Sequence, residues 1–263
     1  MQKKILASLL VTPLAFNAFA NIVLDDLNSA ANWIPGALAG DNYQVTPGEN
    51  GSYLIKAGVS VGTVTQSIKG LRKGTYQIKF TTFKNAELKV TGAGASKVTE
   101  GADNTFQFDI TGGDITVTIS AEDKADVFEF GGASFEIVFD FAAMQTTLLE
   151  GLDVTLNDVP EKDETAAAKD LRAQKAALEA ECKTLTETVN KLEGGNDMTT
   201  EEQLKLYDEL KLYNAADPKA TEGLAAEVAG YQTDAAAYNK AVDEETAKFK
   251  AVENNTSFRS EER

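Results

Sequence analysis

The chain contains no histidine and only one cysteine, Cys182, among its 263 residues. Without imidazole, the Ser-His-Asp and Cys-His arrangements of nucleophilic enzymes cannot form, and zinc sites that need histidine are excluded. A single cysteine cannot close an internal disulfide bond, so the fold must be stabilised by packing. No remaining motif demands catalysis, and we expect a protein that is not an enzyme.

Positive charge is also scarce, because 25 lysines and arginines stand against 41 aspartates and glutamates, a net charge of −16. Nucleic acids and anionic lipid surfaces bind proteins through lysine and arginine, so this balance repels both. We therefore expect no nucleic-acid partner.

Long hydrophobic runs are absent as well. The most apolar stretch, residues 5–16, is too short to span a bilayer, and we expect no transmembrane segment. Two lysines precede this stretch and an Ala-Phe-Ala sequence ending at Ala20 follows it, which is typical of a cleaved signal peptide over residues 1–20. The alternative is a buried N-terminal helix. The signal peptide predicts export to the periplasm, the outer surface or the extracellular space.

Residues 21–141 are rich in valine, isoleucine, threonine, phenylalanine and glycine. Short runs of alternating apolar and polar residues recur between glycine-rich turns, which predicts an all-β sandwich. The clearest runs are residues 52–56, 62–68, 75–83, 87–90, 105–110, 115–120 and 134–141. Their inward faces are expected to carry Tyr76, Ile78 and Phe80, then Phe106, Phe108 and Ile110, then Phe135, Ile137, Phe139 and Phe141.

From residue 142 onward alanine, glutamate, lysine and leucine dominate. A heptad repeat predicts one long helix; its positions are Leu171, Leu178, Leu185 and Leu192, with Ala168, Lys175, Cys182 and Val189 between them. Thr199 and Glu202 match a capping box for a second, short helix. Asp217 followed by Pro218 indicates the start of a third. Its apolar stripe contains Leu224, Val228, Tyr231, Ala235, Tyr238, Val242, Phe249 and Val252, interrupted by Glu245.

These patterns divide the chain into a sandwich (21–141), a linker (142–160), a helical coiled-coil segment of three helices (161–255) and a disordered tail (256–263). The helical segment is expected to be a hairpin or a three-helix coiled coil. Its long helices could pair within one chain or between chains, and the second case would make a homo-oligomer.

A family resemblance narrows the fold of the sandwich. Residues 64–76, VTQSIKGLRKGTY, resemble the pattern Q-x-I-x-G-L-x-x-G-x-Y of galactose-binding-like jelly-roll domains, which exported proteins of Bacteroides-type gut bacteria carry in numbers. Residues 130–137, FGGASFEI, resemble the closing strand of that family, and Trp33 stands where it places a tryptophan. The resemblance covers residues 21–141. It implies a jelly roll that serves as a carbohydrate-binding module, an adhesive domain or a structural spacer.

Many members of that family hold a structural calcium ion, and the resemblance implies which carboxylates would do so here. Asp25, Asp26 and Asp140 belong to the first and last strands, and Ca²⁺ takes several oxygen ligands. The alternative is that the three are solvated surface acids.

A sugar-binding site would need an exposed aromatic platform, and the candidates are Trp33, Tyr43 and Tyr53. The alternative for Trp33 is a place in the core, since aromatic residues at core-facing positions are normally packing residues. Cys182 is expected to be a small buried hydrophobe, the alternative being an interchain disulfide. Arg72 and Lys73, at the turn after residue 71, are interpreted as solvated corner charges.

Two functions are compatible with these features. The first is an exported, non-catalytic cell-envelope protein that binds a glycan or glycoprotein, with the helices as spacer or oligomerisation segment. The second is a structural or protein–protein interaction protein of the cell surface, in which the sandwich is itself only a spacer.

Overall fold

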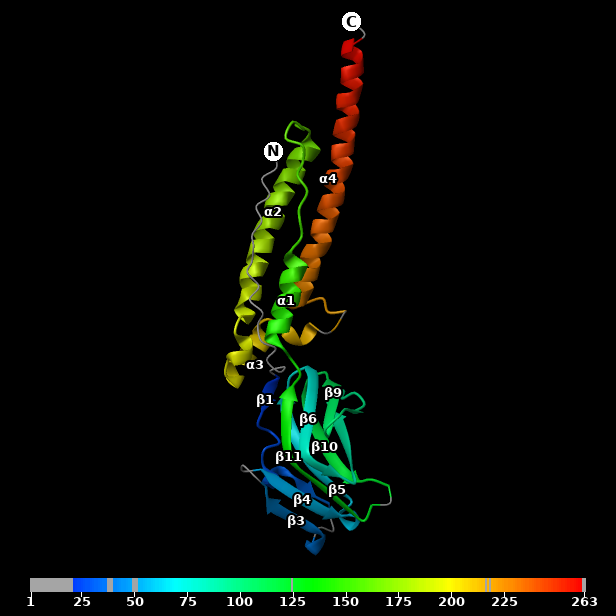
Figure 1. The fold of residues 1–263 in the computed structure, drawn as a ribbon, viewed down its shortest axis with the longest axis vertical. Coiled ribbons are helices and arrows are strands. Elements are labelled where there is room, and N and C mark those ends of the chain that lie inside the picture. The colour runs from blue at the N-terminus through cyan, green and yellow to red at the C-terminus, as the bar shows by residue number, and fades with distance from the viewer. Residues whose placement is uncertain are drawn as a thin grey trace.

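The computed structural model describes residues 21–261, except 37–39, 49–51, 124, 216 and 218, and describes side chains up to residue 252. The predicted signal peptide, residues 1–20, lies outside the described residues. Figure 1 shows an elongated molecule with the β-strands at one end and the long helices at the other.

The strands form two antiparallel sheets. The larger has seven strands, in the order β3 (Tyr43–Pro47), β4 (Tyr53–Gly58), β11 (Val127–Ile137), β6 (Gly74–Lys84), β9 (Thr105–Ile110) and β8 (Thr99–Glu100), with β1 (Ile22–Leu24) also paired to β11. The smaller has four, in the order β2 (Ile34–Pro35), β5 (Thr63–Leu71), β10 (Gly113–Ala121) and β7 (Ala86–Gly92).

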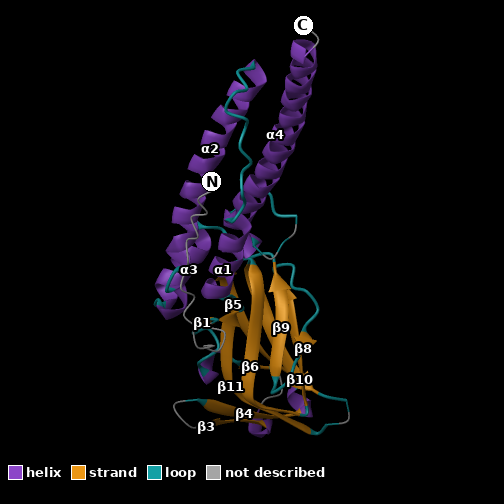
Figure 2. Ribbon diagram, turned by 45° about the horizontal axis from the view of Figure 1, so that its top comes forward, coloured by secondary structure: helices purple, strands orange, loops and turns teal. Residues whose placement is uncertain are grey.

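The two sheets share one hydrophobic core, which gives a sandwich-like arrangement (Figure 2). The inward faces predicted from alternation are confirmed for three strands of the larger sheet, because Tyr76, Ile78, Phe80, Phe106, Phe108, Ile110, Phe135 and Ile137 are no more than 3% exposed. The smaller sheet contributes Val64, Ile68, Ile115, Val117 and Ile119, which are also buried. Four strands that the sequence did not predict, β1, β2, β3 and β8, complete the sheets.

The end of the sandwich differs from the prediction. The strand predicted at residues 134–141 begins earlier and ends at Ile137, and helix α1 (Phe141–Leu152) follows. Asp140 is the N-cap of α1, since its carboxylate accepts hydrogen bonds from the backbone N–H groups of Ala142 and Ala143. The prediction of a linker from residue 142 is therefore wrong for its first part. Helix α1 was difficult to predict because only three of its residues, Phe141, Leu148 and Leu152, form its buried apolar face.

The two long helices, α2 (Ala166–Val189) and α4 (Leu224–Glu261), run antiparallel beside one another (Figures 1 and 2). Their contact is made within one chain. The predicted apolar positions are buried along most of both helices: Ala168, Leu171, Leu178, Leu185 and Val189 in α2, and Leu224, Val228, Tyr231, Ala235, Tyr238 and Val242 in α4. Cys182 is half-buried, with its Sγ 3.6 Å from the carbonyl oxygen of Leu152, so it packs inside the helical region.

The segment between α1 and α2 has no regular structure, yet side chains of α4 hold it. The amide of Asn239 accepts from the backbone N–H of Asn157 at 2.7 Å and donates to the carbonyl of Thr155 at 2.9 Å. The Tyr238 hydroxyl donates to the carbonyl of Asn157 at 2.8 Å. Residues 153–160 are therefore packed along the helices instead of forming a free linker.

Helix α3 (Thr200–Glu209) begins at the predicted capping box of Thr199 and Glu202, which is confirmed. The third predicted helix starts later than expected, because α4 begins at Leu224 and Asp217 instead accepts from the N–H of Lys219 in a turn. At its other end α4 continues to Glu261, so the tail predicted to be disordered is mostly helical backbone. That tail has no glycine or proline to stop a helix, and extending an existing helix is inexpensive. No helix in the described part of the chain has the length and apolar composition needed to cross a membrane.

Candidate functional site

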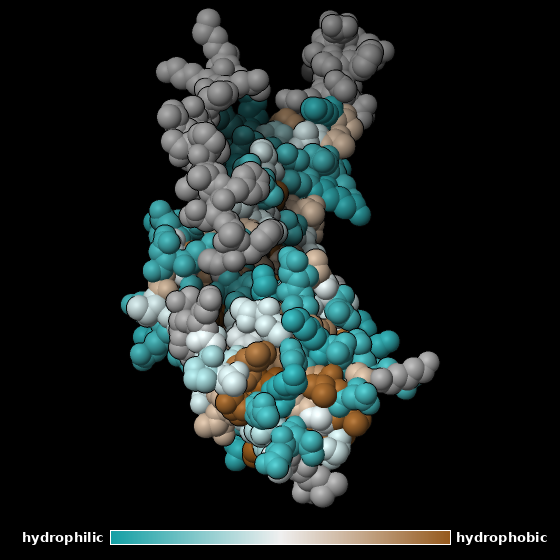
Figure 3. Space-filling model, turned by 60° about the horizontal axis from the view of Figure 1, so that its bottom comes forward, coloured by the Kyte–Doolittle hydropathy of each residue, from teal (hydrophilic) through white to brown (hydrophobic). Residues whose placement is uncertain are grey.

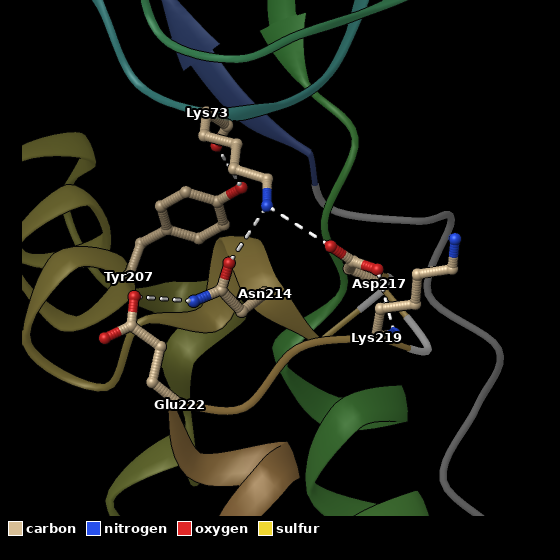
Figure 4. A network of polar contacts seen from close by, with 6 residues as sticks. All are labelled: Lys73, Tyr207, Asn214, Asp217, Lys219 and Glu222. Atoms are coloured by element: carbon tan, nitrogen blue, oxygen red, sulfur yellow. Dashed lines mark hydrogen bonds and ion pairs between the residues drawn. The ribbon is translucent and has the colours of Figure 1, made fainter.

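The sandwich and the helices meet at the turn between β5 and β6. Figure 4 shows Lys73 reaching from this turn to the segment between α3 and α4. Its Nζ donates to the Asn214 side-chain oxygen at 3.1 Å and lies 3.5 Å from an Asp217 carboxylate oxygen. Asn214 in turn donates to Glu222 at 3.4 Å, and Glu222 pairs with Lys211 at 2.6 Å. A lysine of the sandwich thus joins a polar network of the helical region.

Arg72 and Tyr207 make further contacts at this junction between the sandwich and the helical region, the joint. The Arg72 Nε lies 2.7 and 2.8 Å from the two carboxylate oxygens of Asp208, and this hydrogen bonding raises the pKa of Arg72. The Tyr207 hydroxyl donates to the Lys73 carbonyl at 3.1 Å, and burial raises the pKa of Tyr207. Gly74 permits this approach, since a Cβ atom there would lie 2.6 Å from the Tyr207 oxygen. The interpretation of Arg72 and Lys73 as solvated corner charges is therefore wrong.

A row of aromatic rings crosses the joint. Phe139, just after β11, packs edge-to-face on Tyr207 with 5.2 Å between ring centroids, and on Phe141 at 4.9 Å. Tyr207 lies 6.0 Å from the ring of Tyr213. Such pairs contribute about 0.5–1.5 kcal/mol each beyond the area they bury. The joint is consequently both polar and tightly packed.

Beside these rings lies a cleft of about 690 Å³, lined by residues of both parts. The sandwich contributes Lys73, Thr75, Asp109 and Phe139, while α1 contributes Met144 and the segment after α3 contributes Tyr213. The volume falls within the range of about 300–1,000 Å³ that is usual for small-molecule sites. A mainly apolar lining with a few convergent polar groups is also typical of such sites.

Among the described residues that line this cleft, carboxylates outnumber cations, with Asp109, Asp140 and Asp217 against one lysine, Lys73. Asp109 accepts a hydrogen bond from the Thr75 hydroxyl at 2.6 Å. The backbone N–H of Lys219 and then the Lys73 ammonium hold the pKa of Asp217 below its usual value. The cleft therefore has a negative formal charge, in keeping with the charge of the whole chain.

The structure places two of the three predicted aromatic residues in the core. Trp33 is 3% and Tyr53 6% exposed, and the Trp33 Nε1 donates to the Tyr53 hydroxyl at 2.6 Å. The Tyr53 hydroxyl donates to the Leu27 carbonyl at 3.0 Å, and burial raises the pKa of Tyr53 to about 12. Neither ring has a face free for a sugar. This corrects the expectation of an exposed platform at Tyr53, and it confirms the alternative given for Trp33, a place in the core.

Tyr43 lies next to this pair but is only half-buried, and its hydroxyl is 3.4 Å from the Trp33 carbonyl. It belongs to the part of the sandwich that points away from the helices. Figure 3 shows hydrophobic side chains gathered at that end, and the exposed large hydrophobic residues of β2, β3 and the turn after β4 are Ile34, Val45 and Val59. Tyr43 remains a candidate contact residue there.

The three predicted calcium ligands do not come together. The antiparallel register of β1 with β11, Ile22 opposite Ile137 and Leu24 opposite Phe135, carries Asp25 toward one end of β11. Asp140 follows the other end, about 20 Å away at 3.3 Å per residue, and caps α1. In the described part of the chain, no group of three or more histidine, cysteine or acidic side chains could hold a metal ion.

A second hollow, of about 770 Å³, lies where β11 passes β4 and β6. Hydroxyl groups dominate its lining, which includes Thr46, Ser52, Thr81, Thr82 and Ser134, and its described lining residues carry no charge. Among its described lining residues Tyr53 is the one aromatic side chain, and none carries a carboxylate.

The sequence did not predict the joint cleft, although it drew attention to three of its lining residues in other roles. Asp140 was a predicted calcium ligand, Lys73 a corner charge and Phe139 part of a strand face. The available signal was Asp140, an N-cap residue type directly before Phe141, but Asp140 also fits the polar face of the strand alternation, so the pattern favoured a strand there. No protein-family model and no curated protein matches this chain.

Proposed function

We propose that this protein is an exported, non-catalytic component of the cell envelope that binds a glycan or glycoprotein. In this proposal residues 21–141 are a galactose-binding-like jelly roll, as the pattern at residues 64–76 suggests. The leader-like residues 1–20 support a location in the periplasm, on the outer surface or outside the cell. The absence of histidine supports a binding role over a catalytic one.

The observation that carries the proposal is the joint cleft. It combines half-buried aromatic side chains, Phe139 and Tyr213, with hydroxyl and carboxylate groups at Thr75, Thr147 and Asp109. Aromatic rings offer an apolar surface to the C–H face of a sugar ring, while carboxylates and hydroxyls exchange hydrogen bonds with sugar hydroxyls. The helical region then acts as a spacer that carries the sandwich, and its heptad leucines are buried within one chain, so copies of the chain would associate through other faces of the helices.

The test is a glycan-array screen of the protein followed by calorimetric titration of the best ligand. Tyr213→Ala removes a ring from the cleft and is expected to weaken binding about tenfold, the effect of losing an aromatic anchor worth some 1.4 kcal/mol. Tyr43→Ala is the matched control, since it removes a half-buried tyrosine at the opposite end of the sandwich. Circular dichroism establishes that both variants fold.

Loss of binding in Tyr43→Ala but not in Tyr213→Ala would move the site to the far end of the sandwich. A blank array with correctly folded protein would count against glycan binding altogether.

The alternative is a structural or protein–protein interaction protein of the cell surface. The contacts of Arg72, Lys73 and Tyr207 favour it, because they fix the sandwich on the helices as a spacer requires. Sedimentation of the intact protein separates the cases in part, because association through the helices predicts a dimer or higher oligomer at high concentration. A monomer would remove the oligomerisation role.

A further inference from the structure

We propose that the ligand of the joint cleft is a saccharide that carries a positively charged amino group, an inference that rests on the proposed glycan-binding function. The starting point is the charge of the cleft. Its one lysine, Lys73, is already engaged by Asn214 and Asp217. Two further carboxylates, Asp109 and Asp140, line the same cleft without a lysine or arginine partner among the described residues.

Both carboxylates are oriented by hydrogen bonds to one of their two oxygens. At Asp140, the N–H groups of Ala142 and Ala143 and the side-chain amide of Asn196 all donate to Oδ1, at 3.0–3.1 Å. At Asp109, the Thr75 hydroxyl donates to Oδ1 at 2.6 Å. In each case Oδ2 is left to accept from a ligand. A charge-assisted hydrogen bond from an ammonium group to such a fixed oxygen is stronger than one from a neutral hydroxyl.

The aromatic rings favour the same chemistry. A cation near the face of a phenylalanine or tyrosine ring is attracted by the ring quadrupole, and Phe139 and Tyr213 both line the cleft. The apolar side of a sugar ring packs on the same surface. A saccharide with uronate, sulfate or phosphate groups would instead be repelled by the carboxylates and by the net charge of −16. The described lining of the hydroxyl-rich hollow beside β4 carries no charge, which suits a neutral ligand better.

The first experiment compares three probes by calorimetric titration of the intact protein: a glucosamine trisaccharide, its fully N-acetylated counterpart and a glucose trisaccharide. N-acetylation removes the positive charge and retains the ring. We expect the amino form to bind about tenfold more tightly than the N-acetylated form. Raising the salt concentration from 0.05 to 0.5 M should reduce that preference, because part of the site is exposed to solvent.

The second experiment neutralises the two carboxylates with Asp109→Asn and Asp140→Asn together. Asparagine at position 140 still caps α1, so the fold is retained. The matched control is Asp123→Asn with Glu87→Gln, which changes the total charge equally at exposed positions outside the cleft. The preference for the amino sugar should fall to about twofold or less in the first variant and persist in the control.

The outcomes separate the inference from the proposed function. Equal affinity for the amino and N-acetylated sugars, in the unmodified protein, would overturn the inference and leave glycan binding intact. No binding of any of the three probes, together with a blank array, would overturn both. A trilysine peptide that binds as tightly as the amino sugar and competes with it would show that the cleft selects cations of another class, which would also overturn the inference.

Discussion

At the scale of single residues, the sequence identifies chemical types more reliably than exposure. Trp33 and Tyr53 have the composition of a sugar platform, yet the Trp33 Nε1 donates to the Tyr53 hydroxyl and both rings are buried. Buried tyrosine and tryptophan usually find such partners for their polar atoms. A hydrogen-bonded pair that is 20 residues apart in sequence leaves no local pattern, so alternation could not predict it.

The buried Tyr53 hydroxyl makes the stability of the protein sensitive to alkaline pH. Burial raises the pKa of Tyr53 to about 12, against about 10 in the unfolded chain. Because the unfolded state releases this proton first, stability is fully present below pH 10 and falls as the pH rises to 12. The loss amounts to about 1.4 kcal/mol per pH unit, or roughly 2.7 kcal/mol over the interval.

Urea unfolding at pH 9 and at pH 12 measures this effect. Tyr53→Phe cannot ionise at this position, so the free energy of unfolding of the unmodified protein should fall by about 2.7 kcal/mol relative to that of the variant between the two pH values, which makes the variant the more stable protein at pH 12. At pH 9 the variant should be less stable by about 1 kcal/mol, since it loses its hydrogen bonds to Trp33 and Leu27. Parallel pH curves for the two proteins would contradict the prediction.

At the scale of elements, strand β11 is the central strand of the larger sheet, since it pairs with β1, β4 and β6. Its Gly131 lies opposite Leu54 in β4 and Thr82 in β6, and the register with β6 continues unshifted at Ala133. A Cβ atom at Gly131 would lie 2.1 Å from the Tyr53 carbonyl oxygen and 2.9 Å from the Leu54 Cα. Both are backbone atoms of the neighbouring strand, which cannot move aside without breaking the pairing.

Gly131→Ala should therefore destabilise the protein by about 3 kcal/mol or more, the order of magnitude for a forced backbone shift in a packed core. Gly230→Ala is the matched substitution, because no atom lies within 4 Å of a Cβ built at this position in α4. It should stabilise the protein by about 0.5–1 kcal/mol through helix propensity. Thermal unfolding of both variants provides the measurement, and equal effects of the two alanines would refute the steric argument.

Elements with a strong local period could be predicted from the sequence, whereas those defined by distant contacts could not. The heptad leucines of α2 and the capping box of α3 are local signals, and both are confirmed. Residues 153–160 have no period of their own, and they are ordered by Tyr238 and Asn239 from another helix. Of the joint cleft, the sequence analysis named Lys73, Phe139 and Asp140, each in a different role, because the lining residues come together from five separate stretches of the chain.

At the scale of the whole molecule, the sandwich and the helices are coupled at the joint, and α3 also packs against β1. Tyr207 is central, since its hydroxyl donates to the Lys73 carbonyl and its ring packs on Phe139 and near Tyr213. The partly exposed ion pair of Arg72 with Asp208 adds less than the packing does, because salt bridges near the surface contribute only about 0–1 kcal/mol. Cooperative unfolding of the two parts therefore depends mainly on the aromatic row.

Tyr207→Ala should uncouple the two parts. Scanning calorimetry of the unmodified protein is expected to give one transition, and the variant two, because loss of this packing leaves each part with its own core. Tyr43→Ala is the control: it removes a half-buried tyrosine away from the joint, so it should lower the midpoint without dividing the transition. Small-angle scattering should also show a broader distribution of overall lengths for Tyr207→Ala alone. A single transition and an unchanged scattering profile in that variant would mean that the polar network of Lys73, Asn214 and Asp217 suffices to hold the joint.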